Sequence, residues 1–543
     1  MRGSNDITIY EVSNETNSAI FNKLLYENLR AHKILFKRCT VGKEEHIRLF
    51  SIKSNVNVKF IILCHSDPKL LLKFFNALSD AITNYGSVIA KQYGISLGNV
   101  SKVYAKGLSR VDDNLALKVK MLMNEIRSSI NNMVIISSND FSTLNAWLND
   151  IKWKIVGLLF TDAKLHDWIK GLRITFGTTD PYGAATFLSQ VRVSTMYVDY
   201  YRYTSQGPKP AMIFTLSSKL LETICSDCVP RFKEIVSHSR VIFNTVRKEF
   251  EGNTKVKGHK IMESLNKILE IADRASDVLI HDSLIPADYR SIAMFIGSLI
   301  SYDGYIHGNV LVLTRNLQTL KGVIVESLLK ALEKTKPMDL LLGFVEKYIQ
   351  EVSLYTSKKL RKYVMNEIDH IRKRELLSKM MKETQEVKLQ ELVDRIKHLN
   401  ESIEKVSLIS WHDRKYPDSH GYRLMIYLRN PLLADMISNM LMSANIHVQR
   451  LQRSRIIKVM NYKPQLTALL LLINKVSLNT VLPNYKRKAL LWNYLIELCD
   501  SLDTLKEILI RKGLWNKSYD STYNKITRNL LILLKRLHHA KLK

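Results

Sequence analysis

Two short apolar segments each run into a single aspartate and are followed by similar sequences. The first is Ile155-Val-Gly-Leu-Leu-Phe-Thr-Asp162, and the second is Ile296-Gly-Ser-Leu-Ile-Ser-Tyr-Asp303. Each reads as a short helix whose acid lies in the last turn, where the partial negative charge of the helix end disfavours a carboxylate unless a cation lies beside it. The pair Asp162 and Asp303 therefore indicates a metal site.

The composition favours a globular protein that binds polyanions. The chain has 543 residues, and its 46% hydrophobic content argues against disorder and allows several domains with real cores. Lys and Arg number 81 against 51 Asp and Glu, which gives a net charge of +30. Such an excess predicts attraction to nucleic acid. The alternative is a basic surface with no dedicated ligand, because charge alone does not specify a partner.

Membrane insertion and a disulfide framework are not expected. The longest apolar run lies within residues 466–473, which is far shorter than the ~20 residues that span a bilayer. No apolar targeting core follows the first residues. The five cysteines are scattered, so we expect a reducing compartment and a cytoplasmic protein without a membrane partner. Cys225 and Cys228 have the spacing of half a zinc site, but no second Cys pair follows them.

Two common kinds of enzyme site have no support in the sequence. There is no glycine-rich phosphate-binding loop, so nucleotide hydrolysis is not indicated. There is also no Gly-x-Ser-x-Gly turn, so acyl transfer by a serine nucleophile is not indicated.

Residues 87–103 have the spacing of a helix-turn-helix. A small Ala90 allows two helices to cross closely, Gly94 allows a sharp turn, and Val100 and Val103 would bury the second helix. The segment resembles the helix-turn-helix of DNA-binding regulators, although an ordinary helical hairpin shows the same pattern. The exposed face of the second helix would carry the nucleic-acid contacts Ser96, Asn99, Ser101 and Lys102, with Leu97 near it.

The elements after the two aspartates follow one order. After Asp162, alternation predicts strands at 171–177, 194–203 and 211–216, with helices over 182–191 and from 217 onwards. After Asp303 the order begins again, with strands at 304–307 and 309–314 and a helix over 317–333.

These segments resemble the motifs of LAGLIDADG homing endonucleases. Gly157 and Asp162 match the packing glycine and the acid of the first motif, and Ala163 replaces its final glycine. In the second motif, the matching residues are Ser298, Asp303 and Gly304. Phe160 and Ser301 stand where an earlier acid of the motif would be. In that family, two motif helices pack through small residues, each delivers one acid to adjacent divalent metal ions, and two curved antiparallel sheets straddle the DNA major groove.

The resemblance implies an α+β protein with two αββαββα repeats that binds double-stranded DNA and, if active, hydrolyses phosphodiesters with Mg²⁺. Gly157 and Ser298 would pack the helices together, and Asp162 and Asp303 would be both the catalytic acids and the metal ligands. Basic residues of the strands would contact the DNA, and these are Lys164, Arg173, Arg192, Arg202 and Lys209.

Several alternatives remain open at this point. One is an inactive DNA- or RNA-binding regulator of the same fold, a relic of a mobile element or a splicing helper. Another is a structural polycation with no specific site. A further alternative is that both aspartates are only the last residues of buried helices and have no functional role.

The C-terminal half is predicted to begin with long charged helices. A seam of apolar residues with spacings of three and four suggests either an internal helical hairpin or a dimer through residues 389–406. We otherwise expect a monomer with an internal repeat. Its members are Leu389, Leu392, Ile396, Leu399, Ile403 and Val406. From 421 to 478 the order strand, helix, hairpin, helix resembles that at 171–224. It is open whether this stretch completes the second repeat after a helical insertion.

These observations divide the chain into seven regions. They are 1–80, an N-terminal α+β region; 81–135, the helix-turn-helix-like region; 136–280, the first repeat; 281–336, the start of the second repeat; 337–418, a helical and partly coiled-coil-like insertion; 419–478, a strand-helix-hairpin-helix segment; and 479–543, a basic helical tail.

Overall fold

The computed structural model describes most of the chain. The described residues are 7–12, 19–41, 58–65, 67–107, 110–130, 133–137, 144–168, 171–251, 261–307, 310–336, 339–344, 351–383, 403–412, 420–430, 434–443, 448–450, 456–459, 464–473, 478–480, 485–511, 513–515 and 517–539.

The chain forms two compact units, which are described separately. The first unit comprises Met1–Ile306, Leu313–Leu328 and Val364–Leu377. The second unit comprises His307–Val312, Leu329–Tyr363 and Ser378–Lys543. The fold is α+β, as the sequence predicted.

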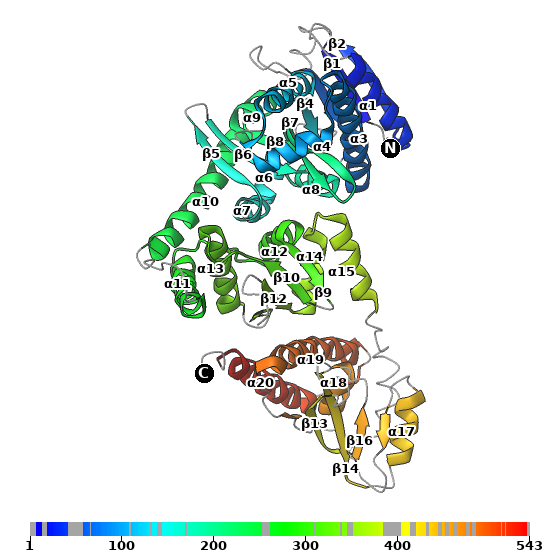
Figure 1. The fold of residues 1–543 in the computed structure, drawn as a ribbon. Coiled ribbons are helices and arrows are strands. Elements are labelled where there is room, and N and C mark those ends of the chain that lie inside the picture. Colours follow the sequence, from blue (N-terminus) through cyan, green and yellow to red (C-terminus); the bar gives the residue numbers. More distant parts are fainter. Residues whose placement is uncertain are drawn as a thin grey trace. The chain divides into compact units, whose positions relative to one another are not determined.

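The first unit is built on a mixed eight-stranded sheet with the order β2-β1-β3-β4-β7-β8-β6-β5 (Figure 1). The pairs β1–β2 and β3–β4 are parallel, and the other neighbours are antiparallel. The strands are β1 (Ile7–Val12), β2 (Phe36–Val41), β3 (Phe60–Leu63), β4 (Met133–Ile136), β5 (Lys164–Trp168), β6 (Gly171–Thr178), β7 (Val193–Thr204) and β8 (Gly207–Ser217). The strands of the N-terminal α+β region, β1 to β3, continue the sheet of the first repeat through the β3–β4 and β4–β7 pairings.

Some helices of this unit cover the sheet or join its strands, and others follow them along the chain. They include α1 (Ala19–Ala31), α3 (Pro68–Gln92), α4 (Leu97–Lys106), α5 (Asp113–Ile130), α6 (Leu144–Asp150), α7 (Lys152–Phe160), α8 (Pro181–Val191), α9 (Ser218–Ile224), α10 (Cys228–Glu251), α11 (Ile261–His281), α12 (Tyr289–Asp303) and α15 (Ile371–Glu383). Local chemistry sets their starts. Asp180 caps α8 directly before Pro181, and Asp288 caps α12 by accepting from the backbone N–H of Ser291.

Two smaller sheets follow along the chain. A four-stranded sheet has the order β11-β12-β10-β9, and a five-stranded sheet has the order β15-β16-β14-β13-β17. The latter is antiparallel except for the parallel pair β13–β17. The strands are β9 (Gly304–His307), β10 (Val310–Thr314), β11 (Leu340–Phe344), β12 (Glu351–Thr356), β13 (Ile403–His412), β14 (His420–Leu428), β15 (Val448–Arg450), β16 (Ile456–Val459) and β17 (Leu478–Thr480). The helices are α13 (Leu320–Thr335), α14 (Lys358–Glu367), α17 (Ala434–Ser443), α18 (Pro464–Ile473), α19 (Tyr485–Arg511) and α20 (Lys517–His539).

One order of elements occurs twice in full. Helix α7 is followed by the hairpin β5–β6, helix α8, the hairpin β7–β8 and helix α9. Helix α12 is followed in the same way by β9–β10, α13, β11–β12 and α14. The strand orders β7-β8-β6-β5 and β11-β12-β10-β9 also correspond. The strands and helices predicted after each aspartate are thus confirmed.

The helical insertion predicted for 337–418 is wrong in its described part. Strands β11 and β12 directly follow α13 and complete the second copy of the order, so residues 421–478 are not its missing half. Ile403 and Val406 lie in strand β13, while Leu389 to Leu399 fall outside the described residues. The prediction failed at this end because Ile403 and Val406 continue the helical spacing of the seam. The alternation of Val406 and Leu408, which is typical of a strand, fits the same residues.

Candidate functional site

Helices α7 and α12 pack against each other at Gly157 and Ser298. A Cβ on Gly157 would lie 2.8 Å from the Ser298 Cβ and 3.2 Å from the Phe295 carbonyl oxygen, so only glycine fits without a shift. The Ser298 hydroxyl donates to the Lys154 carbonyl oxygen over 2.8 Å, across the same interface. The two small residues therefore allow the helix backbones to approach closely, which brings their C-terminal ends together.

The aspartates at these helix ends meet. Asp162 follows the end of α7, and Asp303 is the last residue of α12. Burial, the charge of Asp162 and a side-chain hydrogen bond with Asp162 raise the pKa of Asp303 to about 7, although Lys373 and Lys321 act in the opposite direction. Two adjacent carboxylates resist double ionisation. The pair therefore favours a bound proton or another cation.

Two lysines lie beside this pair and bind the ends of both helices. Lys321 Nζ donates to the carbonyl oxygens of Thr161 (3.0 Å) and Ala163 (2.5 Å). Lys373 Nζ donates to the carbonyl oxygens of Ile300 (2.8 Å) and Ser301 (3.0 Å). Burial lowers the pKa of both amines, to about 8 for Lys373, against the opposing charges of the aspartates. These cations satisfy the free carbonyls and the negative end of each helix.

A buried polar network holds the interface of the two helices. Lys154 on α7 is 9% exposed, and its Nζ lies 3.0 Å from the Asp369 carboxylate and 3.1 Å from that of Glu367. Burial lowers the pKa of Lys154, but the two acids outweigh it and leave the pKa raised. Gln190 Nε2 donates to Asp369, and the Tyr302 hydroxyl donates to Gln190. The network thus links both Asp-bearing helices to the segment between α14 and α15.

The sequence did not reveal these partners. Lys321, Lys373 and Asp369 lie in segments that read as ordinary charged helices, where a charge run is usually a solvated face. A usable signal existed only for Lys321, which lies in the first turn of the helix after the second hairpin strand.

Removing Lys154 is expected to be strongly destabilising. In Lys154→Met, Asp369 and Glu367 would stay in place without their cation. We expect the free energy of unfolding to fall by about 3–5 kcal/mol, the usual cost of breaking a buried ion pair from one side. Chemical denaturation checks this, with Lys233→Met on an exposed position of α10 as the control. Equal stability of the two variants would contradict the role of the network.

His238 packs against the edge of Trp153, with the ring centroids 5.2 Å apart. Burial lowers the pKa of His238 to about 4, helped by Lys152. Since the folded pKa is depressed, the neutral ring contributes stability that is complete above about pH 6.5 and is lost as the pH falls towards 4.

The contribution of His238 can be measured by difference. Relative to His238→Phe, the wild type is expected to lose roughly 1–3 kcal/mol between pH 6.5 and 4. Denaturation of both proteins at each pH cancels the titration of other groups, including Asp303. Parallel stability curves for the two proteins would show that His238 does not titrate with a depressed pKa.

One face of the β5–β8 half of the large sheet is polar. Strand β6 alternates the buried Ile174 and Phe176 with the less buried Arg173 and Thr175. His166 pairs with Arg173 in register, and its Nε2 lies 2.8 Å from the Thr175 hydroxyl oxygen. Burial, Arg173 and the exposed Lys164 lower the pKa of His166. Basic and hydroxyl side chains therefore share this face.

The other basic residues expected to contact DNA differ in their surroundings. Arg202 is exposed on β7. Lys209 is paired with Asp80, 3.3 Å away, so its charge has a partner within the fold. Arg192 lies at the C-terminal cap of α8 in the left-handed region (φ 54°), and its guanidinium stacks on Trp147 at 5.2 Å. The assignment of Arg192 to a strand is therefore wrong, because the helix end requires a left-handed residue before β7 begins.

The predicted helix-turn-helix corresponds to α3 and α4. Gly94 makes the turn with φ +66°, and Ser96 caps α4 by accepting from the Asn99 backbone N–H. Asn99 and Lys102 are exposed. Ser101 is only 4% exposed and donates to the Leu97 carbonyl oxygen, so its placement on the outer face is wrong.

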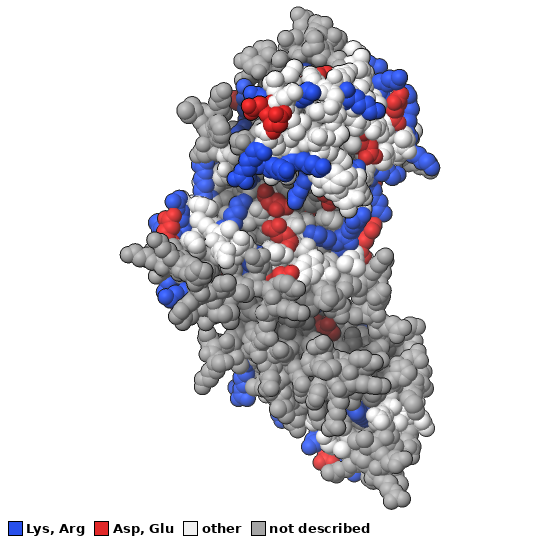
Figure 2. Space-filling view, viewed as in Figure 1, with Lys and Arg blue, Asp and Glu red and all other residues white. Residues whose placement is uncertain are grey.

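Helix α4 also packs on strand β7, where Tyr104 contacts the Tyr200 ring. One side of α4 therefore faces the sheet. In the view of Figure 2, Lys and Arg side chains gather in a row over the region where Figure 1 draws α4 and α6.

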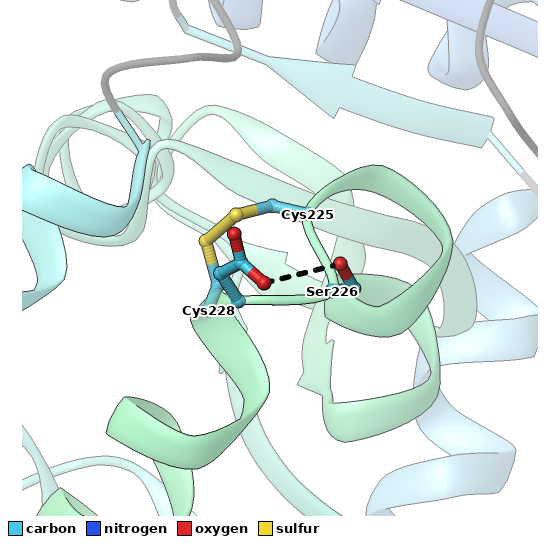
Figure 3. Close-up of a disulfide and its surroundings, with 4 residues drawn as sticks. Cys225, Ser226 and Cys228 are labelled. Atoms are coloured by element: carbon cyan, nitrogen blue, oxygen red, sulfur yellow. Dashed lines mark hydrogen bonds between the residues drawn. A yellow bond between two sulfur atoms is a disulfide. The ribbon is translucent and has the colours of Figure 1, made fainter.

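Cys225 and Cys228 form a disulfide between the C-terminal cap of α9 and the start of α10 (Figure 3). The intervening Ser226 and Asp227 contact each other. The pair is thus bonded to itself and supplies no zinc ligands in this state. The sequence predicted no disulfide framework, and this bond is a local one that forms because the turn between the two helices brings both sulfurs together.

The described residues contain no group of three or more His, Cys, Asp and Glu side chains that could hold a metal ion. Asp162 and Asp303 alone would supply carboxylate ligands, and their oxygen chemistry suits Mg²⁺, which is commonly held by one or two carboxylates plus substrate phosphates. In the same described parts of the chain, no helix is both long and apolar enough to cross a membrane.

Comparison of the chain with protein-family models, curated proteins and solved structures gives no match. The interpretation of the site therefore depends on its own geometry. The central feature is a contact between two carboxylates at the ends of two helices that begin two corresponding sets of elements.

Proposed function

We propose that the chain is a DNA-binding protein of the LAGLIDADG homing endonuclease type, with its acid pair in the first unit. The observation that carries this proposal is the close packing of α7 and α12 through Gly157 and Ser298, which brings Asp162 and Asp303 into contact. If the two helices were only part of a buried core, packing alone would not favour two carboxylates side by side, since that contact is unfavourable without a cation.

The order of elements supports the same proposal. The sets α7 to α9 and α12 to α14 have the αββαββα order expected of the two repeats, and each begins with one Asp-bearing helix.

In the proposed reaction, the acid pair provides negative charge for Mg²⁺ at the phosphodiester. Bound Mg²⁺ would supply Lewis-acid stabilisation of the phosphate and activation of water. Asp162 and Asp303 would hold the ion, while Lys321 and Lys373 fix the backbone at the ends of both helices. The buried network around Lys154 keeps these helices in register.

The polar face of the β5–β8 strands is the proposed contact surface for duplex DNA. Lys164 and Arg173 provide positive charge, and His166 and Thr175 provide hydrogen-bonding groups between them. Arg and Lys contacts to phosphates would give most of the affinity, and side chains that reach base edges would give specificity.

A catalytically inactive binder is the second candidate, favoured by a specific observation. Lys321 and Lys373 already place two cations next to the acids, and the pKa of Asp303 is raised to about 7. Protons and lysines therefore compete with Mg²⁺. Such a protein would act as a regulator, a mobile-element relic or a splicing helper.

The deciding experiment is incubation of the full chain with a randomised duplex library, with and without Mg²⁺. Sequencing of cut ends and of the bound fraction reads both activities together. Cut ends that require Mg²⁺ support the nuclease, and selective binding without cutting supports the inactive binder. Absence of both would reject the DNA-binding proposal.

A further inference from the structure

The second unit contains a third set of hairpins with the same order. The hairpin β13–β14 is followed by α17, the hairpin β15–β16 and α18, as β5–β6 is followed by α8, β7–β8 and α9. The strand order β15-β16-β14-β13 also corresponds to β7-β8-β6-β5. The five-stranded sheet therefore has the topology of the sheet whose polar face is the proposed DNA contact surface.

Helices pack on one face of this sheet. Leu424, Ile426 and Leu428 on β14 are buried, and they belong to one core with apolar residues of α17, α18 and α19 (Figure 1). The residues between them on β14, Met425 and Tyr427, are less buried. The alternation means that these side chains point to the opposite face of the sheet.

That opposite face carries basic and aromatic side chains. Lys405 pairs with Tyr427 in register, and its Nζ lies over the Tyr427 ring at 4.5 Å. Met425 pairs with Lys458, and Lys458 pairs with the exposed Gln449 on the edge strand β15. Lys405 and Lys458 thus lie on one face, on opposite sides of β14. We name Lys405, Met425, Tyr427, Gln449 and Lys458 the second-unit face.

The charge of this part of the chain matches a polyanion. Residues 403–480 contain 11 Lys and Arg against 4 Asp and Glu. A solvated surface usually carries Lys, Arg, Asp and Glu in mixed order, whereas this stretch has nearly three basic residues for each acidic one. The phosphate backbone of nucleic acid carries regularly spaced negative charge that such an excess attracts.

We infer that the second-unit face is an additional contact surface for the phosphate backbone of duplex DNA. The choice of DNA rests on the proposed function of the first unit, whereas the surface itself is a separate site. Lys405 and Lys458 bind phosphates, and Tyr427 holds the Lys405 side chain through its ring. The surface adds affinity and length of bound duplex without contributing acids to catalysis.

The test is a comparison of charge reversals by fluorescence anisotropy with labelled duplexes of increasing length. The double variant Lys405→Glu/Lys458→Glu is compared with Lys525→Glu/Arg528→Glu, two exposed basic residues of α20 in the same unit. For long duplexes at ~100 mM salt, we expect the first variant to bind at least roughly tenfold more weakly and the control to change little. The salt slope should become less steep by about two.

Two further arms separate the inference from the proposed function. Lys164→Glu/Arg173→Glu tests the first unit, and Lys405→Gln/Lys458→Gln tests the same second-unit positions with a smaller perturbation, with thermal melting as the check on folding. If the first-unit variant loses affinity while both second-unit variants behave like the control, the inference is overturned and the proposed function stands. If no variant changes duplex binding, both are rejected. A loss of binding confined to single-stranded RNA would also overturn the choice of duplex DNA.

Discussion

Replacing either Asp162 or Asp303 by Asn is expected to abolish Mg²⁺-dependent DNA cleavage. Asn keeps the shape of the side chain but removes the negative charge that would hold the ion. Because the two carboxylates are adjacent, losing one of them leaves a single carboxylate beside two lysine amines. We expect the cleavage rate to fall by at least ~10³-fold, the scale of a removed metal or transition-state contact.

DNA binding should respond in the opposite direction in these variants. Removing a carboxylate near the backbone lowers repulsion with phosphates, so affinity is expected to be equal or slightly higher. Cleavage and bound fraction are measured in one assay, with Asp150→Asn on the exposed end of α6 as the matched control. Cleavage that survives both substitutions would remove these acids from the mechanism, and wild-type binding without cleavage would favour the inactive binder.

The affinity of the full chain for duplex DNA is expected to fall steeply with added salt. Each phosphate neutralised by Lys or Arg releases a counterion, and a protein that makes 6–10 such contacts loses roughly 10³–10⁵ in affinity between ~50 and ~200 mM salt. The net charge of +30 and the basic side chains on the two sheet faces make a number of contacts in that range reasonable.

The measurement is a titration of labelled duplex at several salt concentrations, with the slope of log affinity against log salt as the readout. Lys164→Glu and Arg173→Glu should each make the slope less steep by about one. A flat slope, or no measurable binding at low salt, would contradict the assignment of a polyanion partner.

The lysines at the helix ends decide how the acid pair behaves without metal. The ammonium groups of Lys321 and Lys373 lie at the two helix ends, where the backbone carbonyls and the aspartates concentrate negative charge. These amines offset the negative charge of the acids and of the helix ends, so the folded state does not depend on a bound ion.

The sequence by itself determined the local features of this protein. The apolar runs that end on Asp162 and Asp303, the small residues at Gly157 and Ser298, and the alternating strands after each aspartate can all be read within short windows, because side-chain periodicity and helix caps are properties of neighbouring residues. Those predictions include the helices over 182–191 and 317–333 and the strands around them, which the structure contains.

Only the tertiary structure decided which of these elements belong together. The second set of elements closes with β11 and β12, whereas the similar order at 421–478 belongs to a third set, because strand pairing depends on contacts between distant residues that no local pattern specifies. For the same reason the sequence placed Ser101 outside and left Lys209 without a partner, although Ser101 is buried in α4 and Lys209 meets Asp80 across the fold. The lysines beside the acids, Lys321 and Lys373, come from helices that are remote in sequence, and only packing brings their charges to the ends of α7 and α12.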